Sequence, residues 1–222
     1  MDERRFDDLT RTLGGARSRR GLLRALLPAA LGLRAGNVFA DSSALPGHAE
    51  VIAHGTAQLS GQLVWRVTRH AGPAGQTTEA LGFLLAAGGS LLVTDGDGAR
   101  TLLIDGAAAF TPAGPQQTLA RFDGGAGVGW RLSLDPASQS ASAGELIFAS
   151  DPFAAPSGTR ALELARDVLG RKEAGTLPDS GQPAAVLAIS GALRVQADRG
   201  TTRTLNAGEA DLFSGALTLT AG

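Results

Sequence analysis

A gapless pattern of glycines and small apolar residues occurs twice in this chain, in residues 89–108 and again in residues 191–210. The offset between the copies is 102, and the matched positions include Gly89 with Gly191, Val93 with Val195 and Gly106 with Gly208. In each copy, alternating apolar and polar residues flank a turn that contains Asp and Gly, as is typical of a β-hairpin. The repeat therefore predicts an all-β fold that contains the same unit twice.

Alternation and turn residues predict strands along the rest of both units. Expected strands are residues 51–57, 62–69, 81–87, 90–94, 100–104, 107–111, 117–122, 128–134, 145–150 and 183–189. Residues 159–168 fit the spacing of a strand and of a helix, and the 102-residue offset favours a strand with a turn of helix at its end. The predicted organisation is a linker over 41–49, a first barrel over 50–135, a linker with a crossing strand over 136–158 and a second barrel over 159–222.

The second unit is expected to be incomplete. The last strands of the first unit, residues 121–134, would map to positions 223–236, and the chain ends at Gly222. The interpretations are an open sheet edge, a truncated sequence or a strand supplied by a partner. Because an open edge exposes unpaired N–H and C=O groups, the sequence predicts a homodimer formed through it.

The first forty residues have the features of an export signal. Arg19 and Arg20 precede the short apolar run 25–33, and a small-x-small site ends at Ala40. This order resembles a twin-arginine signal peptide over residues 1–40, cleaved after Ala40. The alternative is an amphipathic helix, since Phe6, Leu9 and Leu13 recur at helical spacing. We expect an exported protein that is periplasmic, attached to the cell surface or secreted.

Composition excludes several classes of partner. The net charge is -1, so no basic field favours nucleic acid. The absence of cysteine excludes a lipid-anchored cysteine and disulfide bonds. After the signal, no apolar run reaches the roughly twenty residues of a membrane span. Stability must therefore come from an apolar core, in which Trp65 and Trp130 are expected.

One spacing in the first unit resembles a known family. Gly106 is followed after five residues by Pro112-Ala113-Gly114. This spacing, together with the order of strands and turns around it, resembles the second motif of the cupin superfamily. The resemblance implies two tandem cupin-like (jelly-roll) β-barrels that follow an N-terminal signal helix.

The same resemblance implies that the metal site of the family is missing. Where the family has a metal-binding histidine and an asparagine, this chain has Gln117 and Arg121. The His-x-His pair of the family's first motif would fall within residues 75–78. The acidic residue nearest to the position of that motif's glutamate is Glu79. In the second copy, Ser214 and Leu219 stand at the proline and histidine positions.

The three histidines do not compensate for this loss. His48 is predicted in a solvated linker, and His54 and His70 are predicted at strand ends, with no carboxylate at ligand spacing. We therefore expect no metal and no other cofactor.

The predicted function is binding or structural rather than catalytic. Glu79, Gln117 and Arg121 would form a ligand cluster for a small anion or a sugar in the first barrel. Glu79 on a loop and Arg121 on a solvent face are the structural alternative. A second hypothesis is a metal-independent enzyme, an isomerase or lyase acting on a sugar or small acid, with Glu79 as base. A third is a surface protein that only assembles.

Overall fold

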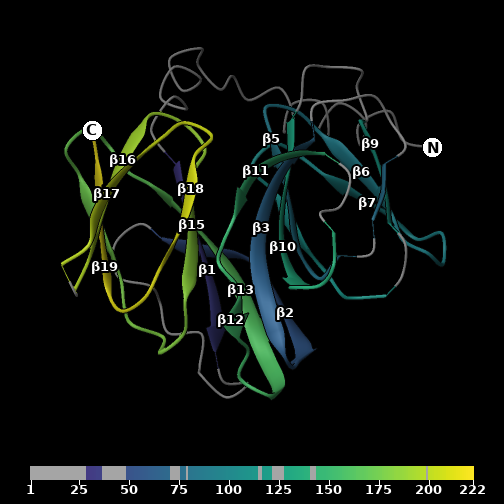
Figure 1. The fold of residues 1–222 in the computed structure, drawn as a ribbon. Coiled ribbons are helices and arrows are strands. Elements are labelled where there is room, and N and C mark those ends of the chain that lie inside the picture. The colour runs from purple at the N-terminus through teal and green to yellow at the C-terminus, as the bar shows by residue number, and fades with distance from the viewer. Residues whose placement is uncertain are drawn as a thin grey trace, which may run out of the picture.

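The computed structural model is all-β in the residues it describes, which are 29–36, 49–70, 76–78, 80–114, 117–121, 128–140, 144–198 and 200–222. In 29–36, 76–78 and 117–121 the backbone alone is described. The strands form four sheets, which we call A to D, arranged in two groups side by side (Figure 1). In the part of the chain that is described, no helix is long and apolar enough to cross a membrane.

Sheets B and C contain most of the first half of the chain. Sheet B has the order β11-β3-β10-β5-β8, and β12 also pairs with β3. Sheet C has the order β4-β9-β6-β7. The bounds in sheet B are β3 Gln62–His70, β5 Gly82–Ala87, β8 Ala108–Thr111, β10 Val128–Pro136, β11 Glu145–Ala149 and β12 Phe153–Ala154. Those in sheet C are β4 Gln76–Thr78, β6 Leu91–Thr94, β7 Arg100–Leu103 and β9 Gln117–Arg121.

Sheets A and D contain the second half, together with two strands from the beginning of the chain. Sheet A has the order β18-β15-β1-β13-β2, and sheet D has the order β14-β19-β16-β17. The bounds in sheet A are β1 Ala29–Gly36, β2 Glu50–Leu59, β13 Gly158–Val168, β15 Ala184–Ala188 and β18 Ala210–Phe213. Those in sheet D are β14 Ala174–Leu177, β16 Ala192–Ala197, β17 Thr202–Asn206 and β19 Leu217–Ala221.

Three apolar clusters hold the sheets together. The largest joins sheets A and B and contains Trp65, Phe83, Trp130, Leu164 and Leu187. A second fills the space between sheets A and D, and a third, which includes Leu84, Leu91, Val93 and Leu103, lies between sheets B and C. Trp65 and Trp130 are buried, which confirms their predicted place in the core.

One glycine permits the close approach of sheets A and B. A Cβ atom at Gly55 of β2 would collide with the ring of Phe110 of β8. The Phe110 ring also meets Phe83 edge to face, with ring centroids 5.5 Å apart. The missing side chain at Gly55 thus makes room for an aromatic contact between the two sheets.

Most predicted strands are confirmed to within a few residues, because their signals are local. The segment 159–168 is strand to its last residue in β13, without the predicted turn of helix. The prediction that His54 lies at a strand end is wrong, because His54 lies within β2. The same prediction for His70 is confirmed, because His70 is the last residue of β3. β10 continues through Pro136, two residues past the predicted strand, and Asp135 is buried.

The position that the sequence leaves open in the second unit is occupied by β1. All eight residues of β1 pair with β13, and Ala30, Leu31 and Gly32 also pair with β15. β1 lies within the segment predicted as an export signal, while residues 1–28, including Arg19 and Arg20, and 37–48, including Ala40 and His48, lie outside the described residues. A homodimer through this edge remains a prediction for a chain without β1.

Candidate ligand-binding site

One face of sheet B is polar although it is buried. Side chains alternate along a strand, so β10 directs Trp130, Leu132 and Leu134 to the core shared with sheet A and directs Arg131, Ser133 and Asp135 to the opposite face. β3 alternates in the same way, and Thr68 lies directly across from Arg131. We call the buried polar residues on this side the polar face, and they are Arg66, Thr68, His70, Thr111, Arg131, Ser133 and Asp135.

Sheet C covers the polar face. A Cβ atom at Gly129 of β10 would lie 3.0 Å from Leu91 Cδ1 of β6, so the two sheets are in contact here. On the β5 side, Arg131 has Leu84 as its cross-strand neighbour, and Leu84 packs in the apolar cluster with β6 and β7. The polar face therefore lies inside the first unit, between two sheets, and not at the molecular surface.

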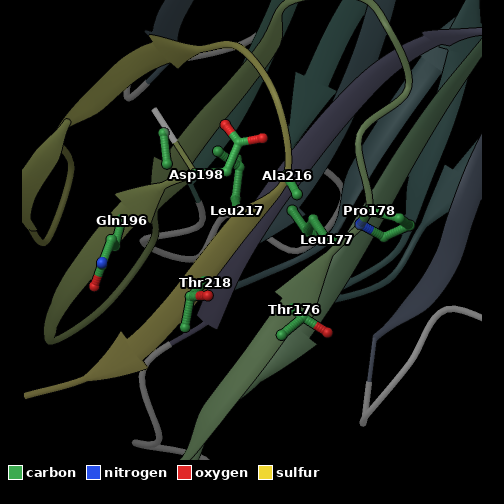
Figure 2. Close-up of a pocket in the computed structure, with 9 residues that line it drawn as sticks. Thr176, Leu177, Pro178, Gln196, Asp198, Ala216, Leu217 and Thr218 are labelled. Atoms are coloured by element: carbon green, nitrogen blue, oxygen red, sulfur yellow. The ribbon is translucent and has the colours of Figure 1, made fainter. Parts of the chain in front are cut away.

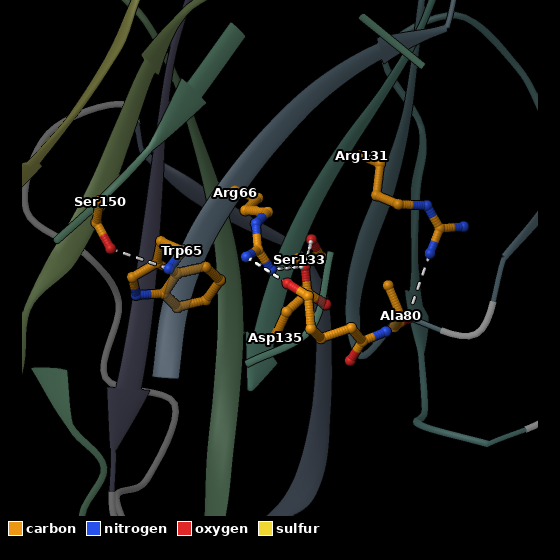
Figure 3. A network of polar contacts seen from close by, with 8 residues as sticks. Trp65, Arg66, Ala80, Arg131, Ser133, Asp135 and Ser150 are labelled. Carbon is orange, nitrogen blue, oxygen red and sulfur yellow. Dashed lines mark hydrogen bonds and ion pairs between the residues drawn. The ribbon is translucent and has the colours of Figure 1, made fainter. Parts of the chain in front are cut away.

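An ion pair fixes one end of the polar face (Figure 3). Arg66 Nη1 donates to Asp135 Oδ2 at 3.0 Å, and the side chains of the pair are 10% and 2% exposed. The same Oδ2 accepts a bond of 2.8 Å from Ser133 Oγ, and Arg66 Nη2 donates to the Gln139 carbonyl at 2.7 Å. These bonds compensate for the burial of both charges.

Arg131 is buried without comparable compensation. Its side chain is 0% exposed, and Nη1 donates to the Ala80 carbonyl at 3.2 Å. Among the described residues, none accepts a hydrogen bond from Nε or Nη2. Burial lowers the pKa of Arg131 from its ordinary value to about 10, and the nearby Asp135 carboxylate offsets part of this fall. At neutral pH the guanidinium is thus a buried cation whose Nε and Nη2 donors meet no acceptor among the described residues.

The polar face also has hydroxyl and imidazole groups near Arg131. Thr68 Oγ1 and His70 Nε2 are 3.2 Å apart, and Thr111 Oγ1 donates to the same Ala80 carbonyl at 3.2 Å. In Figure 3, the Arg131 side chain extends from β10 toward Ala80, on the side of the sheet opposite Trp65. An enclosed cation with hydroxyl groups on the neighbouring strands is a site that can hold a small anion.

The residues that the sequence nominates for ligand binding are described only in part. Glu79 lies outside the described residues. Gln117 and Arg121 belong to β9 of sheet C, where their backbones pair with Thr78 and Leu91. Their side chains lie outside the described part, so the predicted cluster of three stays a prediction.

The two described histidines, His54 and His70, lie in different parts of the structure. His54 is exposed on β2, whereas His70 is buried on the polar face. Within the described ranges, no group of three or more His, Cys, Asp or Glu side chains could hold a metal ion.

Sequence reasoning missed Arg131 for a physical reason. In residues 128–136, large apolar residues alternate with Arg, Ser and Asp, which is also the pattern of a strand with one face in water. The available signal was that β3 has the same alternation, in which Arg66 and Thr68 alternate with Trp65 and Val67. Two neighbouring strands with matching polar residues indicate a polar face, but not whether another sheet covers it.

A pocket lies on the other half of the molecule (Figure 2). It has a volume of about 230 Å³ and is lined by β14, β16, β19 and the adjoining residues Pro178, Asp198 and Ala216. Its polar residues Thr176, Gln196, Asp198 and Thr218 are exposed. No buried polar atom without a partner lies among its described lining residues. This pocket is therefore a weaker candidate than Arg131.

Comparisons with known proteins yield a single distant likeness. No protein-family model matches the chain, and no curated protein matches it. Among solved structures, the chain is similar to the protein YhaK from Escherichia coli, with a TM-score of 0.45 and 14% identity, over 85% of this chain and 87% of that chain. A likeness this distant carries no argument about ligand or activity.

Proposed function

We propose that this protein is an exported, non-catalytic binding protein of two tandem cupin-like barrels, and that the first barrel holds a small carboxylate against Arg131 without a metal. The observation that carries the binding function is the pair of Arg131 N–H groups without an acceptor among the described residues. Nε and Nη2 form one edge of the planar guanidinium, and their N–H bonds are parallel. A carboxylate has two oxygens at the matching spacing.

Charge favours the same class of ligand. The polar face contains two arginines and one aspartate, and Asp135 is paired with Arg66. An anion beside Arg131 would restore neutrality in a region where an isolated charge is costly. A neutral sugar would satisfy N–H groups but not the charge, so an acid is the better fit.

The tandem arrangement is supported by the order of the strands. Sheets C and D have the orders β4-β9-β6-β7 and β14-β19-β16-β17, and the 102-residue offset brings β6 onto β16 and β7 onto β17. In sheet B, β5 lies between β10 and β8, as β15 lies between β1 and β18 in sheet A.

The binding proposal is tested by calorimetry with a panel of small solutes on the full chain. The panel is acetate, succinate, benzoate, gluconate, phosphate, sulfate and glucose. We expect at least one carboxylate to bind, and the Arg131→Met variant to lose that binding. Arg131→Lys keeps the charge but loses the parallel N–H pair, so we expect at least a tenfold weaker affinity. Arg69→Met is the matched control on an exposed arginine of β3 and should bind as the original chain does.

Two outcomes would overturn the binding proposal. One is that no member of the panel binds at millimolar concentration, and the other is that Arg131→Met binds with unchanged affinity. The Glu79→Gln variant tests whether the Glu79 carboxylate of the chain itself neutralises Arg131. Anion binding that appears only in this variant would also contradict the proposal. Gln117→Ala and Arg121→Ala test the remaining predicted ligand residues, which are excluded if affinity does not change.

The export proposal has a separate test. The full gene is expressed in a bacterium with a twin-arginine pathway, and the protein outside the cytoplasm is identified by mass. We expect a chain that begins at Asp41, and we expect Arg19→Lys with Arg20→Lys to retain the protein in the cytoplasm. Export of the double variant at the original level would count against the signal.

A further inference from the structure

The place of β1 in sheet A defines a gap one strand wide. β1 lies between β13 and β15, just as β10 lies between β3 and β5 in sheet B. β13 continues to β2 on its other side, and β15 continues to β18. Without β1, both β13 and β15 would present unpaired N–H and C=O groups toward the gap, which is the arrangement that accepts an added strand.

Of the two strands that border the gap, β15 is apolar on both faces of the sheet, and β13 is apolar on the face toward sheet B. Leu162, Leu164 and Leu187 pack in the core toward sheet B, and Val186 packs toward sheet D; all four are 0% exposed. A strand in the middle of such a sheet needs apolar residues on both faces. The β1 sequence AALGLRAG has one charged residue in eight, so its composition fits the gap.

The chain can reach the gap from within the same molecule. β1 ends opposite Ala161 and β2 begins opposite Arg166, on the two sides of β13. These points are about 20 Å apart, given strand spacings of roughly 4.8 Å and a rise of roughly 3.3 Å per residue. The connection is residues 37–49, and a chain of this length spans up to about 43 Å. A second copy is therefore not needed to supply β1.

We propose that the gap between β13 and β15 is a strand-acceptor site for an extended apolar segment, and that its occupant is the chain's own Ala29–Gly36. The site opens to such a segment in trans when residues up to Ala40 are removed. The occupancy goes beyond the proposed carboxylate binding and does not depend on it, whereas the opening rests on the proposed cleavage.

The first test asks whether β1 has this register in the full chain. Because the chain has no cysteine, an introduced pair can form only one disulfide. Arg34 and Glu163 are cross-strand partners, so their Cα atoms are about 5 Å apart, within the range that a disulfide requires. We expect Arg34→Cys with Glu163→Cys to cross-link within one molecule. The matched control, Arg34→Cys with Ala161→Cys, is two residues out of register and should cross-link at least tenfold more slowly.

The second test asks whether the gap binds a strand that is no longer covalently attached. A specific protease site replaces residues 41–47 of the full chain, the chain is cut, and the products pass through gel filtration without denaturant. We expect the fragment with β1 to remain bound, and an excess of labelled peptide of residues 27–38 to exchange with it. The same peptide with Gly32→Pro should not exchange, because proline removes a ladder donor at a residue that pairs on both sides.

Two results would overturn the inference. In one, the fragment separates on cutting and the remainder keeps the Tm of the uncut protein, so that β1 contributes nothing to the sheet. In the other, the cross-link joins two molecules and the uncut protein has the mass of a dimer, so that a second copy provides the strand. Neither readout involves carboxylate binding, so failure here is distinct from failure of the binding proposal.

Discussion

At the scale of single residues, the unusual feature is a buried arginine that the described residues neutralise only in part. Lowering the pKa of Arg131 from its ordinary value to about 10 corresponds to about 3 kcal/mol of unfavourable free energy in the folded, ligand-free state. The ligand-free protein should then gain stability when the charge is removed, while losing its binding function. Such a trade between stability and function is common at binding sites.

The pH dependence of stability tests this cost directly. Above pH 10 the unfolded chain still holds a proton on residue 131 that the folded chain has released, so stability rises with pH there until the unfolded chain loses the proton too. Below pH 10 the full cost is present. We expect Arg131→Met to raise the free energy of unfolding by about 1–3 kcal/mol at pH 7 and to lose this advantage above pH 10.

Urea denaturation at several pH values between 7 and 11.5 measures how the free energy of unfolding depends on pH. Few other side chains change their charge in this range. The chain has no Tyr and no Cys, and its one lysine is Lys172. The quantity compared is the free energy of unfolding of the original chain and of Arg131→Met. A difference that does not change with pH would contradict the assignment of the cost to the Arg131 charge, as would a variant less stable than the original chain at pH 7.

The Arg66–Asp135 pair should respond in the opposite way. Arg66→Ala leaves the buried Asp135 carboxylate without its cation, so we expect a loss of about 3–5 kcal/mol. Arg69→Ala on the same strand is the control, because its pair with Glu145 spans 3.7 Å between exposed side chains and is worth less than about 1 kcal/mol. Equal losses in the two variants, measured by urea denaturation, would show that burial of the Arg66 pair does not matter.

At the scale of elements, β10 has a different partner on each of its faces. Trp130, Leu132 and Leu134 join sheet B to sheet A, while Arg131 and Ser133 face the interior shared with sheet C. A sheet that is covered on both sides needs shape complementarity on both. Gly55, which lies against Phe110 from the neighbouring sheet, is one position where this requirement is strict.

Gly55→Ala should therefore destabilise the contact between sheets A and B. The added methyl group would collide with the Phe110 ring, and we expect a loss of about 1–3 kcal/mol in the free energy of unfolding. Phe110→Leu removes the colliding ring, so the double variant should lose less than the sum of the two single variants. Additive losses in this double-mutant cycle would contradict the contact.

Which elements could be predicted from the sequence depends on how far apart the pairing residues are. The hairpin of β6 and β7 turns through Asp95–Gly98, and its turn residues and alternation lie within fifteen residues, so the prediction is accurate. The place of β1 depends on pairing with β13 and β15, which no local pattern indicates. The burial of Arg131 likewise depends on sheet C, and alternation in β10 alone cannot distinguish a covering sheet from water.

At the scale of the whole molecule, the two halves share one core and exchange strands. β2, from the beginning of the first predicted barrel, pairs with β13 of the second, while β11 and β12 pair with β3. Arg166 of β13 donates to the Gly106 carbonyl at 2.9 Å and forms an ion pair with Glu50 of β2. Neither half can bury its side of the A–B cluster alone.

We therefore expect the halves to unfold together. Scanning calorimetry of the full chain should show one transition whose calorimetric and van't Hoff enthalpies agree. Two resolved transitions would mean that the apolar cluster between sheets A and B does not couple the halves.

The pairing of β1 also implies a delay during biosynthesis, because β1 is made before the strands with which it pairs. Its partners on β13 and β15 lie at least 125 residues further along the chain. At about 5–20 residues per second, the ribosome makes them roughly 6–25 s after β1 itself. During that interval the strands that pair with the segment have not yet been made. A cytoplasmic factor that recognises the segment therefore does not compete with the sheet for it. Once β15 has emerged, the same residues can be withdrawn into the sheet.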